Sequence, residues 1–281
     1  MKKILIFLFA LVSLVDATDF YKPFIPIFPQ VSNGRYFKAT ILTGVSIYMI
    51  SDIVKFDDIY EDRKITASKY EKIWQQNMFE QTGNSNFYVE SFVADSSFLD
   101  YSKTNRTLYT SYLNAVTQNR RVLEAEYQKN TDKMWLVAGY TYSFFDALEI
   151  YYPNKKQNIN SFDAMIRSII IPGWGQIYTG SYSHAGFIYS MLIGLGGHAF
   201  YSNKLTNYYE YSILPEHQKQ AEKYSTSTTS YLLYMLGVYL YNIVDAYVEG
   251  ELSNFNLDIS GTSYIQDGKN INANFSINYL F

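Results

Sequence analysis

The chain matches itself when it is shifted by 146 positions, and the match needs no gap. The aligned segments are FIPIFPQVSNGRYFKATILTGVSIYMI and IIPGWGQIYTGSYSHAGFIYSMLIGLG. Among the identical pairs are Pro26 and Pro172, Gln30 and Gln176, Gly34 and Gly180, Tyr36 and Tyr182, and Ala39 and Ala185. Because each segment passes from turn residues into an apolar run, the match predicts two copies of one structural unit.

A second match appears at a shift of 99 positions. It aligns Tyr140, Tyr142, Asp146 and Ala147 with Tyr239, Tyr241, Asp245 and Ala246. Each copy is therefore predicted to contain a turn, a helix, a connection and a second helix that ends with Asp-Ala. The change of shift places 47 additional residues between the two helices of the first copy, from about Val54 to Met134.

Four apolar runs have a length close to that of a membrane span. They cover residues 36–54, 134–151, 185–201 and 231–248, so each contains 17 to 19 residues. A bilayer core needs about 20 residues of helix, and glycines such as Gly139 and Gly194 allow helices to approach closely. The runs predict a protein whose partner is the lipid bilayer. A soluble helical bundle is the alternative, because Ser143 and Asn242 interrupt the runs and the mean hydropathy is only −0.15.

Charge and composition narrow the class of protein. Residues 55–133 and 202–230 hold most of the lysines and arginines, which the positive-inside tendency would place in the cytoplasm. A formal net charge of −3 provides no basic surface for nucleic acid. Aromatic residues make up 18% of the chain, which favours a membrane interface, although a bias toward Tyr codons is an alternative. The absence of cysteine excludes disulfides and thiolate sites.

The N-terminus has the three parts of a secretory signal. Lys2 and Lys3 precede an apolar run from Ile4 to Val15, and the small residue Ala17 follows. We expect cleavage after Ala17, with an uncut anchor as the alternative. The predicted location is therefore the membrane of a bacterial cell envelope, the inner membrane being favoured over the outer.

These observations predict a mainly α, integral membrane fold with two tandem helical hairpins. Its four short transmembrane helices would be joined by an amphipathic helical insertion and followed by a small C-terminal β-hairpin. The predicted divisions are a signal peptide at 1–17, a first hairpin at 18–152 with its insertion at about 55–133, a second hairpin at 153–255, and the β-hairpin tail at 256–281.

The most specific motif lies before the third apolar run. It consists of Pro172, Gly173, Trp174, Gly175, Gln176, Ile177, Tyr178, Thr179 and Gly180. Proline and glycine together interrupt a helix, and Gly180 permits a backbone geometry that other residues disfavour. Trp174 and Tyr178 suit a membrane interface. We predict a turn held at the bilayer surface; a phosphate-binding loop is disfavoured because a third glycine and a preceding strand are missing.

Two aspartates near the ends of apolar runs are the candidate functional carboxylates. Because a hairpin enters and leaves a membrane on the same side, Asp146 and Asp245 should lie at one surface with Gln30 and Gln176. An ionisable group at such a position favours a bonded partner or a functional role. The alternative is a carboxylate that only contacts interfacial water or the glycine-rich turn.

No pattern indicates catalysis or a cofactor. The histidines at positions 184, 198 and 217 lack the spacing of metal ligands, and the serines lack the context of a catalytic triad. We therefore expect a chain that is not an enzyme, with no cofactor and no metal, and with three structural histidines.

The C-terminal tail has a different pattern. Phe275, Ile277, Tyr279 and Phe281 alternate with polar residues after a predicted turn at 267–270, which favours strands. A terminal Phe on such a strand resembles the closing strand of outer-membrane barrels. A single hairpin cannot close a barrel, so we expect a small sheet outside the membrane.

The motif PGWGQIYTG and the later sequence YNIVDAYVEGEL resemble an uncharacterised bacterial membrane-protein family, a domain of unknown function. Its pattern is P-G-x-G-Q-x-Y-x-G with a later D-A-Y-V, and the resemblance covers about Ser161 to Ile259. It implies a membrane location and no known reaction. Our first hypothesis is a scaffold or interaction protein that binds other envelope proteins or itself. The alternatives are a small transporter or channel subunit that uses the aspartates, and an outer-membrane protein.

Overall fold

The computed structural model describes residues 28–83, 105–152, 159–212 and 214–253, and the backbone of residues 256–266 and 270–280. The predicted signal peptide and the terminal Phe281 lie outside these residues. Residues 84–104 of the predicted insertion and most of the predicted turn at 267–270 also lie outside them.

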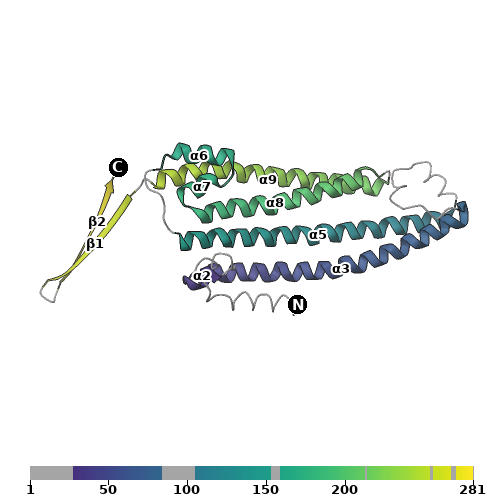
Figure 1. Ribbon diagram of the computed structural model, residues 1–281, viewed down its shortest axis with the longest axis horizontal. Coiled ribbons are helices and arrows are strands. Elements are labelled where there is room, and N and C mark those ends of the chain that lie inside the picture. The colour runs from purple at the N-terminus through teal and green to yellow at the C-terminus, as the bar shows by residue number, and fades with distance from the viewer. Residues whose placement is uncertain are drawn as a thin grey trace.

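Four long helices lie side by side in a row (Figure 1). They are α3 (Tyr36–Thr82), α5 (Arg106–Tyr151), α8 (Tyr182–Glu210) and α9 (Pro215–Ser253). Successive helices run in opposite directions, and the main contacts join α3 to α5, α5 to α8 and α8 to α9. The row therefore leaves large parts of α3 and α9 without a neighbouring helix.

Three short helices gather at the end of the row where α3 and α8 begin and α5 and α9 end (Figure 1). They are α2 (Phe28–Ser32), α6 (Ser161–Ile170) and α7 (Trp174–Thr179). α2 contacts α3 and α5, whereas α6 and α7 pack against α9. This end of the molecule holds the residues that the sequence motifs singled out.

The expected fold class is wrong in its central feature, which was four short transmembrane helices with a separate insertion. α3, α5 and α9 contain 47, 46 and 39 residues, and residues 55–82 and 106–133 simply continue α3 and α5. No proline or glycine interrupts either stretch, so nothing stops the helices at the edge of the apolar runs. Within the described residues, only Tyr36–Gln81 and Glu216–Ser253 are long and apolar enough to be membrane spans.

The backbone after α9 forms two antiparallel strands, β1 (Asn256–Gln266) and β2 (Asn270–Leu280). They pair with each other and project away from the helices (Figure 1). Before these strands, all the elements in the described part of residues 28–253 are helices.

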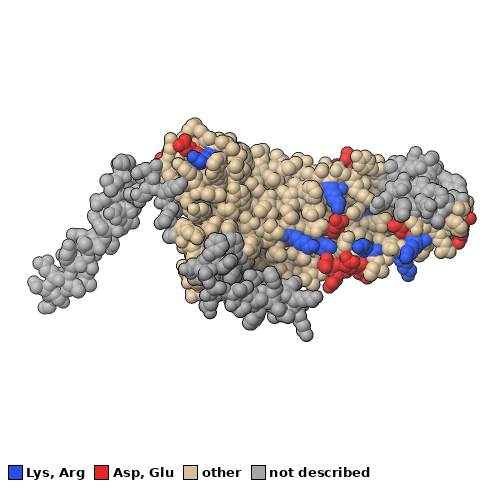
Figure 2. Space-filling model, viewed as in Figure 1, with Lys and Arg blue, Asp and Glu red and all other residues tan. Residues whose placement is uncertain are grey.

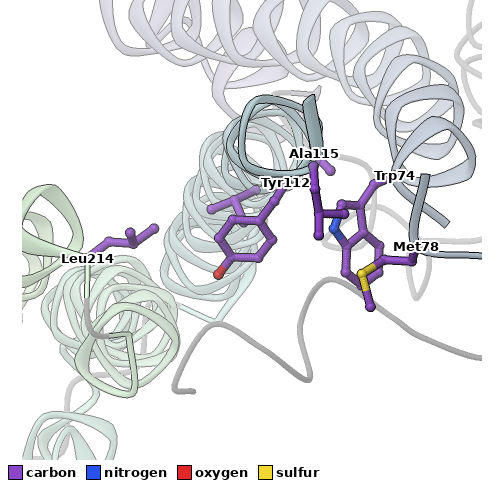
Figure 3. Close-up of a cluster of buried hydrophobic side chains, with 7 residues drawn as sticks. Trp74, Met78, Tyr112, Ala115 and Leu214 are labelled. Atoms are coloured by element: carbon purple, nitrogen blue, oxygen red, sulfur yellow. The ribbon is translucent and has the colours of Figure 1, made fainter. Parts of the chain in front are cut away.

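The half of the row that lies farther from α2 and α7 has an apolar core and a charged surface (Figure 2). We call it the charged half, and it comprises the described parts of residues 55–133 and 202–230. In Figure 3, Trp74 and Met78 of α3 face Tyr112 and Ala115 of α5, with Leu214 beside them. Trp74 and Tyr112 are fully buried, which is the usual arrangement of a protein in water.

A second apolar cluster in the charged half joins α8 to α9 and contains Leu205, Tyr209, Ala221 and Tyr224. The rings of Tyr209 and Tyr224 stack with centroids 5.8 Å apart. Burial raises the pKa of Tyr209, so its phenol remains a donor, and its hydroxyl lies 3.3 Å from Oε1 of Glu124. These contacts tie the far ends of the helices together.

The other half of the row has the opposite organisation, and we call it the apolar half (residues 36–54, 134–151, 185–201 and 231–248). Small residues form its interior: a Cβ atom at Gly194 would lie 2.5 Å from the ring of Trp135, and one at Gly197 would lie 2.6 Å from Met134. Ile188 and Leu195 are buried there, but many of its other large apolar side chains are exposed, with Ile47 62% exposed and Val244 63% exposed. On the face drawn in Figure 2, the tan surface of this half shows few charged side chains, and those that are visible lie mainly near α6.

Candidate functional site

The motif between α6 and α8 forms a tight turn around the short helix α7. Gly173, before α7, has φ 82°, and Gly180, after it, has φ 84°. Both values lie in the left-handed region that glycine occupies without strain. The prediction that Gly180 adopts a geometry closed to other residues is confirmed.

Gln176 is the central residue of this turn, and its side chain is fully buried. Its amide nitrogen donates to the carbonyl oxygen of Asn242 at 2.8 Å and to Oδ2 of Asp245 at 3.0 Å. Its amide oxygen accepts a hydrogen bond from Oγ of Ser168 at 3.0 Å. One amide therefore connects α7 with both α6 and α9.

Asn242 and Ser168 hold the backbone of the turn. Oδ1 of Asn242 accepts from the N–H of Gly173 at 2.7 Å, and Nδ2 of Asn242 donates to the carbonyl oxygen of Ser168 at 2.9 Å. Oγ of Ser168 accepts from the N–H of Gly175 at 3.0 Å. These polar atoms are buried, so the bonds compensate for the loss of water and give the turn one defined position.

Asp245 lies next to Gln176 and has two further partners. Its Oδ1 accepts from the hydroxyl of Tyr241 at 3.1 Å and lies 3.0 Å from Nδ1 of His184. The same imidazole nitrogen lies 3.5 Å from Oε1 of Glu249, whose other oxygen accepts from the hydroxyl of Ser181. We refer to Gln176, His184 and Asp245 as the second centre.

A comparable group is formed by residues of α2, α3 and α5. The buried amide nitrogen of Gln30 donates to Oδ2 of Asp146 at 2.9 Å and approaches the carbonyl oxygen of Ser143 at 3.4 Å. Oδ1 of the fully buried Asp146 pairs with Nζ of Lys38 at 2.5 Å and with the guanidinium of Arg35 at 3.6 Å. We refer to Gln30, Lys38 and Asp146 as the first centre.

Residues that the two sequence shifts align make corresponding contacts in the two centres. The side chains of Gln30 and Gln176 each donate to an aspartate. Each also donates to a backbone carbonyl oxygen that lies one turn before that aspartate on the aspartate's own helix. In both centres, the backbone N–H of the residue five positions after the glutamine donates to the backbone carbonyl oxygen of the glutamine at 2.8 Å. The residue directly before that donor is a glycine with positive φ. Lys38 and His184 occupy matching positions and contact the matching aspartates.

The two centres face a common hollow at the end of the bundle. It has a volume of about 420 Å³ and is lined by Lys38, Tyr142, Ser183, His184, Phe187 and Tyr241. Tyr142 and Tyr241 are again a pair that the shift of 99 aligns. The hollow therefore has a cationic group, an imidazole and three aromatic rings in its wall.

The remaining motif residues lie around the turn. Pro172 separates α6 from α7, and Trp174 is 36% exposed. The guanidinium of Arg167 lies 5.1 Å from the ring of Trp174 and 4.1 Å from that of Tyr178. The two rings are thus positioned by a cation on α6 at the surface of this end.

The structure brings the predicted site residues together in two pairs, Gln30 with Asp146 and Gln176 with Asp245. Both pairs lie at the same end of the bundle, but they are largely buried and do not lie on an open surface. Sequence reasoning missed Lys38, His184 and Glu249. The shift of 146 would have found the first two, because it aligns Lys38 with His184.

These features define a class of protein: a mainly helical chain in which two helices have the length and hydropathy of membrane spans. Residues 157–231 match a family of unknown function, DUF5683. The matched segment is similar to that family and contains the turn and His184, but it ends before Asp245. No curated protein and no solved structure matches the chain significantly.

Proposed function

We propose that this chain is a non-enzymatic membrane protein of a bacterial cell envelope with a scaffold or interaction role. The apolar parts of α3 and α9, the two described helices with the length and hydropathy of membrane spans, would lie in the bilayer, the inner membrane being favoured, and the charged half would extend into water. Its partners would be lipid and either another envelope protein or a second copy of the chain.

The observation that supports this proposal most strongly is that the charged half buries its large apolar side chains, whereas the apolar half exposes many of them. The charged half has buried rings such as Trp74 and Tyr112, whereas the apolar half has exposed side chains such as Leu233, which is 61% exposed. Exposed apolar area on this scale is unfavourable in water and favourable in lipid.

The lengths of the helices agree with a partial insertion. At about 1.5 Å per residue, residues 36–54 span about 28 Å, close to the roughly 30 Å of a bilayer core. α3 contains 47 residues, so about 40 Å of it would remain outside the bilayer. That outer part carries most of the charged residues of the helix, as a surface in contact with water requires.

The bonding of the two aspartates supports a structural role over a transport role. Asp146 is fully buried and bonded to Gln30 and Lys38, and Asp245 is bonded to Gln176 and Tyr241. Buried charged groups with several fixed partners hold helices in place. We propose that the two centres are copies of one duplicated unit, each joining a turn to the end of a long helix.

The proposal of membrane insertion is tested by fractionating bacterial cells that produce the full chain. We expect the protein in the membrane pellet after washing with sodium carbonate at high pH, and in solution only after detergent is added. A peripheral protein would leave the pellet in carbonate. Recovery in the supernatant of a lysate without detergent would overturn the proposal.

A transporter or channel subunit is the second candidate, and the hollow between the two centres is the observation that favours it. The replacement Asp245→Asn separates the roles. The asparagine side chain has the same shape, but its NH₂ group would face groups that donate hydrogen bonds to the carboxylate of Asp245. A structural role therefore predicts a loss of about 1–3 kcal/mol of stability and less protein in the membrane.

The measurement pairs protein abundance in membranes with proton and potassium fluxes in proteoliposomes. We expect wild-type vesicles to show no flux above that of empty vesicles. Asp58→Asn, at an exposed position on α3 in the charged half, is the matched control. Wild-type flux that disappears in Asp245→Asn at normal abundance would establish transport and overturn the scaffold role.

A further inference from the structure

We propose that His184, Asp245 and Glu249 bind a divalent transition-metal ion of the Zn²⁺ type at the second centre. The three side chains come from the start of α8 and the last third of α9. One ligand atom of each lies within 4.8 Å of the others. The sequence predicts no metal site, because the three histidines lack the spacing of metal ligands.

The distances between the ligand atoms fit a single ion. Nδ1 of His184 lies 3.0 Å from Oδ1 of Asp245 and 3.5 Å from Oε1 of Glu249. Ligands about 2.1 Å from a zinc ion lie roughly 3.0–3.5 Å from one another in tetrahedral or octahedral geometry. The two distances from the imidazole nitrogen therefore match those of ligands around one ion, and all three ligand atoms lie within 4.8 Å of one another.

The ligand set and its surroundings also favour a metal. Imidazole nitrogen and carboxylate oxygen are both ligands that Zn²⁺ and similar ions accept. The carboxylate side chains are only 9% and 10% exposed, whereas that of His184 is 42% exposed and lines the hollow. Three protein ligands leave a further coordination position for water or for a group of a partner, and the hollow provides access.

The first centre provides a comparison, because its aligned positions hold different residues from the three proposed metal ligands. The sequence shifts align His184 with Lys38, Ser181 with Arg35 and Glu249 with Ile150. In the first centre, one carboxylate faces an ammonium and a guanidinium, which supply the positive charge. At the second centre, the carboxylate of Asp245 and the adjacent carboxylate of Glu249 face one imidazole. A divalent cation would supply the charge that lysine and arginine supply in the first.

The experiment uses the full chain, purified in detergent with an affinity tag that contains no histidine. After treatment with a chelator, the protein is titrated with Zn²⁺ by calorimetry and with Co²⁺ by visible absorption. We expect one ion per chain, with stronger Co²⁺ absorption than that of the aqueous ion. His184→Gln should abolish binding, and Glu249→Gln should weaken it at least tenfold.

Matched controls separate loss of the ligand from loss of the fold. His198→Gln removes another imidazole from α8, and Glu251→Gln removes an exposed carboxylate two residues from Glu249. Both should retain one ion per chain. Circular dichroism and elution volume must show that the ligand variants remain folded. A wild-type chain that binds no ion, or a folded His184→Gln chain that binds as tightly as wild type, would overturn the proposal.

Discussion

Replacing Gly175 by alanine is expected to destabilise the protein by about 3 kcal/mol, an effect at the upper end of the range for overpacking. A Cβ atom at this position would lie 2.2 Å from the carbonyl oxygen of Ala164, 2.4 Å from Oγ of Ser168 and 2.8 Å from Cβ of Ala246. The first of these atoms belongs to the backbone of α6 and cannot rotate away. The substitution must therefore separate α7 from α6 or from α9.

The measurement is the midpoint of thermal unfolding in detergent, followed by circular dichroism, together with the amount of protein in membranes. Gly237→Ala is the matched control, because nothing lies within 4 Å of a Cβ atom at that helical position. It should leave stability unchanged or raise it by about 0.5–1 kcal/mol. Equal midpoints for the two variants would show that the turn does not pack as closely as described.

Replacing Gln176 by alanine is the second substitution with a large expected effect, also about 3 kcal/mol. It removes hydrogen bonds to Ser168, Asn242 and Asp245 at once and leaves buried polar atoms without them. A buried donor or acceptor that loses its partner costs about 1–3 kcal/mol, and the vacated volume adds to that cost.

Two other glutamines provide a graded comparison in the same unfolding experiment. Gln30 bonds through its amide nitrogen, but among the described residues its Oε1 has no hydrogen-bond partner, so Gln30→Ala should cost less, about 1–2 kcal/mol. Gln218 is exposed on α9, so its replacement should change stability by less than about 0.5 kcal/mol. A different order of the three variants would contradict the roles given to the two centres.

The sequence by itself determined which positions correspond and where the apolar runs lie. The shifts of 146 and 99 aligned Gln30 with Gln176 and Asp146 with Asp245, and the aligned side chains make corresponding bonds. The residues of the turn were recognisable because Pro and Gly act on the local backbone, as the positive φ of Gly173 and Gly180 illustrates. Such signals are local, so a single sequence contains them.

The tertiary structure alone decided how far each helix continues and which distant side chains meet. Hydropathy marks the apolar part of α3 at 36–54, but the helix runs on to Thr82 because its charged continuation packs against α5 around Trp74. His184 and Asp245 are 61 positions apart, and only the packing of α8 against α9 brings Nδ1 to 3.0 Å from Oδ1. Contacts of this kind depend on the relative placement of whole helices, which local periodicity does not specify.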